Sequence, residues 1–284
     1  ALAGDFDTAV DVEPGGTLHL DLEWRGEVFV ATHEAAAVRI EARGRGWPWD
    51  VAFDLVRDGD DVRLTGETVA ADDPAARLVV LALWPFRHAH VEVHAWVPGR
   101  YSVDVRTRGW QVDVEGLRGR VGVDTRGGEM RIRHVEGNVD AESGGGQVEI
   151  SDVIGDVRAA TGGGAIAIAR VTGALDLQTG GGGIDVHEAG GAVLARSGGG
   201  SIAVRFMGVP AGEIETGGGG IEVRLPAGAG ADLDAETSGG LVAIADGLVV
   251  AGRTDPRHVV GKLNGGGARL HLRTSGGSIR VGPL

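Results

Sequence analysis

Four side chains that could ligate a metal alternate along one short stretch of the chain. His88, His90, Glu92 and His94 occupy every second position, and alanine or valine separates them. Because successive side chains of a β-strand point to opposite faces, this spacing places all four on one side of a strand. Imidazole and carboxylate groups in such a set suit zinc. The solvated face of any half-buried strand has the same pattern, however, and we favour that interpretation, so the sequence predicts no metal site here.

A second candidate is the glycine-rich stretch Gly180–Glu188, GGGGIDVHE, which is similar to a calcium-binding nonapeptide with Asp185 in the ligand position. That motif binds calcium because its loops repeat every nine residues and neighbouring loops share the ion. Here equivalent residues are 18 apart, and the positions that correspond to Asp185 in other units are occupied by Glu149, Ala167, Ala203 and Glu222. We therefore expect no calcium site.

The elements that carry these residues repeat with a period of 18, which is typical of stacked structural units. One column of the alignment is aliphatic (Val103, Val121, Val139, Val157, Leu175 and Val193), and a second carries hydroxyl groups (Thr107, Thr125, Ser143, Thr161, Thr179 and Ser197). Each unit contains two runs of alternating apolar and polar residues, which is the spacing of strands. Two short strands bury too little apolar surface to offset the ordering of their backbone, so each unit must pair with its neighbours. The sequence predicts an all-β fold, a single elongated β-solenoid of short parallel strands.

From Thr125 onward, two or three glycines follow each hydroxyl residue, for example Gly162–Gly164 and Gly180–Gly182. Neither a G-x-x-x-x-G-K-[ST] nor a G-x-G-x-x-G motif is completed, which disfavours phosphate and dinucleotide binding. We interpret the glycines as corners between two facing sheets, where the chain would need the positive φ that glycine adopts without strain. The Ser or Thr before each corner is expected to bond local backbone groups and to stack as a ladder of hydroxyls.

Charged residues on the outward positions alternate in sign from one unit to the next. One column reads Asp140, Arg158 and Asp176, and another reads His134, Asp152, Arg170 and Glu188. Opposite charges on neighbouring strands attract one another, so these columns should stabilise the stacking of the units.

The regularity of the pattern divides the chain into two parts. Residues 1–100 contain strand-like runs without the period, and we expect them to form an irregular β cap at the N-terminal end. Residues 101–284 form the glycine-rich repeats, which are regular over 101–208 and irregular over 209–284. The irregular part begins at a proline-containing insertion, Phe206–Gly212.

Two further features lie outside the regular repeats. Trp47–Trp49 and Leu83–Phe86 are aromatic stretches that could form a platform for sugar rings, although large aromatic side chains more often pack inside a protein. Arg280 and Pro283 are expected to keep the last strand from pairing with another chain, on the assumption that this strand lies at a sheet edge.

Composition narrows the classes of function. The formal net charge of −13 disfavours binding to nucleic acid and to anionic membrane surfaces. The chain has no cysteine, which excludes disulfides and thiolate chemistry. It contains no run of about 18 apolar residues, so we expect no transmembrane segment. It opens Ala-Leu-Ala-Gly without an initiator Met, which fits either a mature N-terminus after signal-peptide cleavage or an arbitrary boundary, and the sequence leaves both open.

Val97–Ile132 reads VPGRYSVDVRTRGWQVDVEGLRGRVGVDTRGGEMRI, and S/T-G-G-G-x-I-x-V units follow it. This pattern resembles the bacterial putative-adhesin family of β-strand-repeat domains. The resemblance covers most of the chain and is best at residues 91–205. It implies a β-solenoid at or outside the cell envelope, with a less regular strand region before the repeats. It supplies no catalytic residues.

From these observations we expect a non-catalytic protein without a cofactor, which presents ordered faces to a macromolecular partner, either a glycan or a protein. The expected location is the cell surface or the periplasm, and a cytoplasmic location stays open. One alternative is a polysaccharide-processing enzyme, which would need a pair of carboxylates. The outward acids from which such a pair could come are Asp140, Glu142, Glu149, Asp152, Asp185 and Glu188. Another alternative is a structural protomer that associates end to end through the ends of the solenoid.

Overall fold

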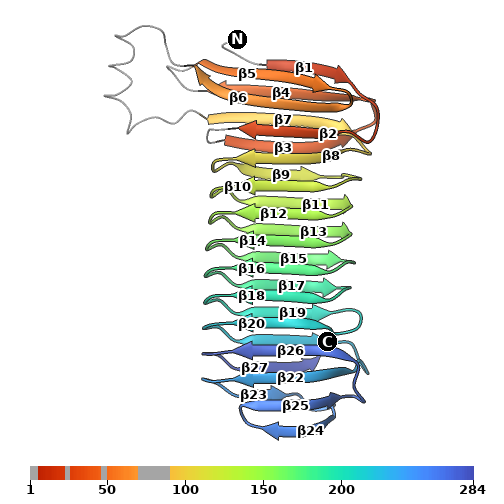
Figure 1. The fold of residues 1–284 in the computed structure, drawn as a ribbon, viewed down its shortest axis with the longest axis vertical. Coiled ribbons are helices and arrows are strands. Elements are labelled where there is room, and N and C mark those ends of the chain that lie inside the picture. The colour runs from red at the N-terminus through yellow and green to blue at the C-terminus, as the bar shows by residue number, and fades with distance from the viewer. Residues whose placement is uncertain (1–5, 23–25, 46–49, 70–89) are drawn as a thin grey trace, which may run out of the picture. The chain divides into compact units, whose positions relative to one another are not determined.

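The computed structural model describes residues 6–22, 26–45, 50–69 and 90–284 (Figure 1). All the regular elements in these ranges are β-strands, which confirms the all-β fold expected from the alternating runs. Within the same ranges there is no helix with the length and apolar character needed to cross a membrane. The chain divides into two compact units, one that ends at Ile132 and one that spans Arg133–Leu284.

The first unit contains two sheets in which parallel and antiparallel strands are mixed. Its strands are β1 (Phe6–Asp11), β2 (Thr17–Leu22), β3 (Gly26–His33), β4 (Ala37–Arg45), β5 (Asp50–Asp58), β6 (Asp61–Val69), β7 (His90–Pro98), β8 (Ser102–Thr107), β9 (Gln111–Glu115) and β10 (Val121–Thr125). One sheet has the order β1-β4-β7-β3-β9 and the other the order β10-β8-β2-β6-β5. β8 and β10 are parallel, with Val103 opposite Val121 as the 18-residue period predicts. The antiparallel pairs β1–β4, β4–β7 and β5–β6 all lie in the part of the sequence that has no period.

The second unit contains the regular repeats. β11 (Met130–Glu136) includes the division between the units, and the strands after it are β12 (Val139–Ser143), β13 (Val148–Ile154), β14 (Val157–Thr161), β15 (Ile166–Val171), β16 (Leu175–Thr179), β17 (Ile184–Ala189), β18 (Val193–Ser197), β19 (Ile202–Phe206), β20 (Gly212–Thr216), β21 (Ile221–Leu225), β22 (Ala231–Thr237), β23 (Val242–Ile244), β24 (Val250–Asp255), β25 (His258–Leu263), β26 (Ala268–Thr274) and β27 (Ile279–Pro283).

From β12 to β21, consecutive strands alternate between two sheets, and each strand up to β19 pairs in parallel with the strand two places later. Val139 lies opposite Val157, and Val157 lies opposite Leu175, so the aligned columns are strand neighbours. β18 and β20 pair at an offset of 19, with Val193 opposite Gly212. The extra residue lies in the insertion that the sequence places there.

The core of the second unit is a narrow aliphatic layer between its two sheets. Ile150 lies opposite Ile168, and Ile168 lies opposite Val186. The other sheet contributes side chains such as Ala159 and Leu177, and all five side chains are buried. Burying a large aliphatic side chain stabilises a fold by about 1.5–3 kcal/mol, so the rows help to hold the repeats together.

The glycine triplets turn the chain between the sheets, but the reason predicted for them is wrong. None of the residues Gly162–Gly164 has a φ in the left-handed region. A Cβ on Gly162 would lie 2.2 Å from the carbonyl oxygen of Gly144, and one on Gly164 would lie 2.1 Å from that of Gly146. A Cβ on Gly163 would meet open space. The first and third glycines are therefore needed because neighbouring corners approach too closely for any side chain.

The last strands of the chain are not at the end of the second unit. The sheet orders are β20-β26-β22-β25-β24 and β21-β27-β23, so β26 and β27 each pair on both sides (Figure 1). Leu270, for example, lies between Gly212 and Leu233. The expectation that Arg280 and Pro283 protect an edge is therefore wrong, because β27 is an interior strand. The strands at the edges are β23 and β24.

Candidate functional site

The buried hydroxyl residues fix the corners and so hold the outward faces in register. Thr179 donates its Oγ1 hydrogen to the carbonyl oxygen of Gly164 in the preceding repeat at 2.8 Å, and it accepts a hydrogen bond from the N–H of Gly182 at 3.1 Å. Thr161 and Ser197 make the same two bonds in their own repeats. The hydroxyl groups therefore bond to the peptide groups between them, and a continuous series of hydrogen bonds links one repeat to the next.

Four outward residues of the second unit share an unusual backbone conformation. His134, Asp152, Arg170 and Glu188 occupy equivalent positions in successive repeats, and each has a φ between 54° and 64°. We call these four residues the charge column. Because L side chains resist the left-handed region, each such residue costs roughly 1–2 kcal/mol of backbone energy. Glycine would remove this cost, and the chain uses 52 glycines elsewhere.

The left-handed residue changes which way the strand points its side chains. In β13, Val148 and Ile150 are buried, and the next two residues, Ser151 and Asp152, both face outward. Val153 is then buried again. The conformation therefore places two successive polar side chains on the surface without moving the aliphatic rows.

Ion pairs join neighbouring members of the charge column. The Arg170 guanidinium donates from Nε to Asp152 Oδ1 at 2.5 Å and from Nη2 to Oδ2 at 2.7 Å. The Nε2 atom of His134 lies 3.8 Å from Asp152 Oδ2 on the other side. The hydrogen bond from Arg170 is the main reason that the pKa of Asp152 falls to about 2, and burial of the carboxyl opposes this shift. The expected attraction between residues of alternating sign is confirmed at this column.

The outward residues beside the charge column are small or polar. Ala169 lies opposite Ser151 on one side and His187 on the other. His187 contacts a carboxylate and a guanidinium, with its Nε2 3.2 Å from Asp185 Oδ1 and its Nδ1 2.8 Å from Arg205 Nη1. The face therefore offers fixed donors and acceptors among small side chains.

The residues considered as metal ligands are only partly described. His88 lies outside the described residues, and so does the side chain of His90. Glu92 and His94 face outward on β7, and Val93 between them is buried, as the alternation predicts. Among the described residues, no group of three or more His, Asp or Glu side chains is placed to hold a metal ion.

An aromatic stack in the first unit was not foreseen from the sequence. The ring of His94 stacks on Phe29 of β3 with centroids 4.8 Å apart, and it lies 6.0 Å from the ring of Trp96. The guanidinium carbon of Arg39 lies 5.6 Å from the Trp96 centroid. The faces of these groups are turned toward one another, which is how cross-strand pairs stabilise a sheet. The only sequence signal was the i, i+2 spacing of His94 and Trp96, and the stretches proposed as a sugar platform, 47–49 and 83–86, lie outside the described residues.

The position considered for calcium has no second carboxylate on the strands beside it. Asp185 is more than half exposed, and its neighbours across the sheet are Ala167 and Ala203, as the alignment predicts. Calcium prefers six to eight oxygen ligands, and a lone carboxylate between two methyl groups does not supply them.

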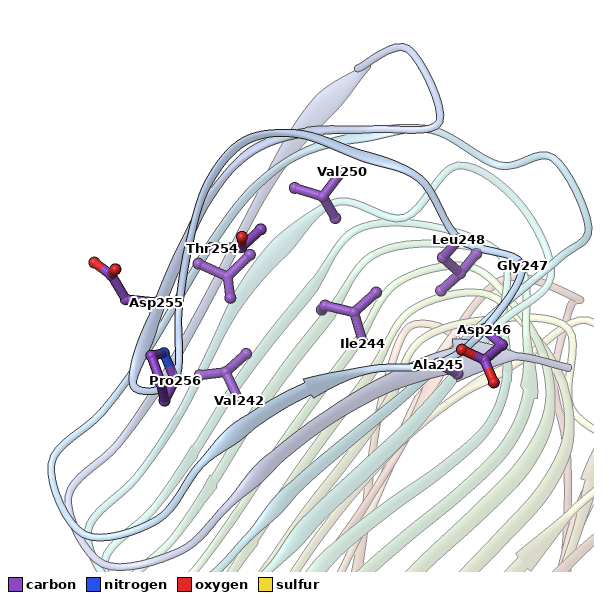
Figure 2. A pocket seen from close by; sticks show the side chains of 11 residues that line it. Val242, Ile244, Ala245, Asp246, Gly247, Leu248, Val250, Thr254, Asp255 and Pro256 are labelled. Carbon is purple, nitrogen blue, oxygen red and sulfur yellow. The ribbon is translucent and has the colours of Figure 1, made fainter.

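A cavity of about 480 Å³ opens at the end of the second unit, between β23 and the β24–β25 hairpin (Figure 2). It exists because β23 has only three residues, after which the chain leaves the sheet and crosses to β24. Its aliphatic lining consists of Val242, Ile244, Leu248, Val250 and Val259. Figure 2 shows side chains from β23 and from the start of β24 around the same space.

The cavity also has polar groups in its lining. They are the carboxyl groups of Asp246 and Asp255 and the hydroxyl of Thr254. The Asp255 carboxylate is paired with the Arg253 guanidinium. The salt bridges of the described residues do not include Asp246, so its negative charge is the uncompensated one.

Comparison with known proteins gives structural likeness without sequence likeness. No protein-family model and no curated protein matches the sequence. A putative adhesin from Parabacteroides merdae is 10% identical to this chain, with a TM-score of 0.48. The match covers 98% of this chain and 96% of that protein's chain. A putative adhesin from Bacteroides fragilis is 8% identical, with a TM-score of 0.46, and the match covers 99% of this chain and 97% of that protein's chain. A putative lipid-binding protein from Parabacteroides distasonis is 9% identical, with the same two coverages and the same TM-score.

At these identities and TM-scores the likeness carries no argument about activity. The resemblance itself is confirmed: this chain is similar to solved structures of bacterial proteins that bear the name putative adhesin.

Proposed function

We propose that this chain is a β-solenoid of the bacterial cell envelope that binds a macromolecular partner and catalyses no reaction. In this proposal residues 1–100 form the N-terminal cap and residues 101–284 form the repeats. The binding surface is the face that carries the charge column, and the partner is a glycan of the envelope.

The observation that carries the proposal is the left-handed conformation of four charged or ionisable residues in successive repeats. Residues held in such conformations are concentrated at functional sites, where the side chain is retained in spite of its backbone cost. The series of hydroxyl–peptide bonds fixes the spacing of these side chains at about 4.8 Å, the distance between neighbouring strands. A rigid line of alternating charges can bind a polymer whose polar groups also repeat.

A glycan fits this face better than a protein does. The outward residues beside the charge column are small or polar, such as Ser151, Ala169 and His187. Protein interfaces are instead centred on aromatic and large aliphatic side chains. Hydrogen-bonding groups at fixed spacing are what a chain of hydroxyl groups requires.

The alternative of a polysaccharide-processing enzyme has less support. Such enzymes need a carboxyl group with a raised pKa as the general acid. The pKa of Asp152 is displaced in the opposite direction, to about 2, because Arg170 stabilises the carboxylate. Asp152 is therefore a permanent anion at neutral pH, which suits binding rather than proton donation.

A set of glycine substitutions tests the proposal while leaving the backbone unstrained. The column variant replaces His134, Asp152, Arg170 and Glu188 by glycine, which adopts their φ freely. The control variant replaces Asp140, Arg158, Asp176 and Arg196, which face outward on the other sheet, by serine. Both variants and the parent are applied to a panel of bacterial envelope glycans, and binding and product formation are both recorded.

We expect the parent and the control to bind one class of envelope glycan and the column variant to bind it at least tenfold more weakly. Circular dichroism confirms that all three proteins are folded. Equal binding by the column variant would show that another surface makes the contact. Shortened glycan products would show that the chain is an enzyme.

A further inference from the structure

We propose that the cavity between β23 and the β24–β25 hairpin binds a small amphiphile with an unbranched aliphatic body and a protonated amine. This site is separate from the charge column, and the inference does not depend on the proposed function. A cavity of about 480 Å³ is within the range of roughly 300–1,000 Å³ that is typical of small-molecule sites.

The walls of the cavity are held open by hydrogen bonds. The N–H of Val242 donates to the carbonyl oxygen of Pro256 at 2.8 Å, which ties β23 to the turn between β24 and β25. The N–H of Ala245 donates to the carbonyl oxygen of Val281 at 2.8 Å. The N–H of Val249 donates to Asn264 Oδ1 at 3.1 Å. Because both ends of the Ala245–Val249 crossing are fixed, the space exists before a ligand arrives, and binding requires little ordering of the chain.

The lining specifies the body of the ligand. The side chains of Val242, Ile244, Leu248, Val250 and Val259 present only hydrocarbon. The cavity lies between the two sheets, where the aliphatic core of the repeats would otherwise continue. A flexible alkyl chain can therefore replace the side chains that another repeat would have contributed.

The charge of the lining specifies the head group. Asp246 carries an uncompensated carboxylate, whereas Asp255 is neutralised by Arg253. Thr254 adds a hydroxyl that can accept a hydrogen bond. An ammonium group would pair with the Asp246 carboxylate, whereas a carboxylate or phosphate would be repelled by it; Thr254 lies on the other side of the cavity (Figure 2).

Linear alkylamines and alkanoates of matched length, from four to twelve carbons, are suitable probes below their micellar concentrations. Binding to the full chain is measured by isothermal titration calorimetry. We expect affinity to rise about fourfold with each added methylene until the cavity is full. Each alkanoate should bind at least tenfold more weakly than the amine of equal length.

Three variants separate the site from general adsorption. Val250→Trp fills the cavity and should abolish binding, whereas Val209→Trp, at an exposed valine outside the cavity, should not. Asp246→Asn, at an exposed turn position, should reduce amine affinity to that of the alkanoate. Equal affinity for amines and alkanoates in the parent protein, or unchanged binding by Val250→Trp, would overturn the proposal. Dimerisation of the parent that Val250→Trp abolishes, without amine binding, would assign the cavity to a second copy of the chain and would also overturn it.

Discussion

Replacing Thr179 by valine should lower the stability of the second unit by about 2 kcal/mol. Valine has nearly the same shape, so the change removes the hydroxyl without opening a cavity. Two hydrogen bonds are lost, one to the Gly164 carbonyl oxygen at 2.8 Å and one from the Gly182 N–H at 3.1 Å. Each typically contributes about 1 kcal/mol net. The full penalty of about 1–3 kcal/mol for each stranded group does not apply, because Gly182 is partly exposed and water can reach it.

Thr179→Ser is the matched control, because Ser197 makes the same two bonds at the equivalent position. This change removes one methyl group and should cost less than about 1 kcal/mol. All six tryptophans lie between Trp24 and Trp110, so tryptophan fluorescence would report on the first unit only. Urea unfolding should therefore be followed by far-UV circular dichroism, and the exchange of the Gly182 amide hydrogen by mass spectrometry. A valine variant as stable as the serine variant, with unchanged amide exchange, would refute the role given to the hydroxyl series.

Three further outcomes are expected. Gly164→Ala should destabilise the second unit by about 1–3 kcal/mol in urea unfolding, because its Cβ would meet a backbone oxygen at 2.1 Å, whereas Gly163→Ala should be neutral or stabilising by up to about 1 kcal/mol. Ile168→Asp should unfold the repeats, since it places an unpaired charge in the aliphatic layer, and a melting temperature equal to the parent's would contradict the inward position. Tyr101, the only tyrosine, should titrate near pH 12 by absorbance at 295 nm, because burial and then the charges of Asp61 and Asp60 raise its pKa. Since its folded pKa exceeds the ordinary value of 10.0, the stability it contributes is intact below about pH 10 and is lost as the pH rises toward 12.

The strand pairing of the regular repeats could be predicted because one spacing describes it. Once Val139, Val157 and Leu175 are aligned, each strand's neighbour, its register and its buried side follow together. The charge column could be predicted only in part. Alternating signs are visible in the sequence, but the left-handed conformation is not. Its signal was a step of three rather than two between inward residues, from Ile150 to Val153.

The order of the strands at the C-terminal end could not be predicted from the same pattern. Thr216, Thr237 and Thr274 each end a strand with the same alternation and are each followed by glycines. Any of these strands can therefore pair with any other in the same register, and local sequence does not select among them. The end cavity depends on that order, because it forms beside the short strand β23. Its position is a property of the assembled sheets.

The placement of β26 and β27 between earlier strands has a consequence for biosynthesis. A ribosome delivers β22 to β25 before the two strands that must lie inside them, so this region cannot be completed in the order in which it emerges. Residues 268–284 act as a closing segment that joins β20 and β21 to the strands beyond them, β22 and β23. A nascent or truncated chain that lacks this segment is missing one strand from each sheet. The strands on both sides of each gap then have unpaired edges that are open to other chains. Quality control of this region therefore has a simple signature, which is whether residues 268–284 have been made and inserted.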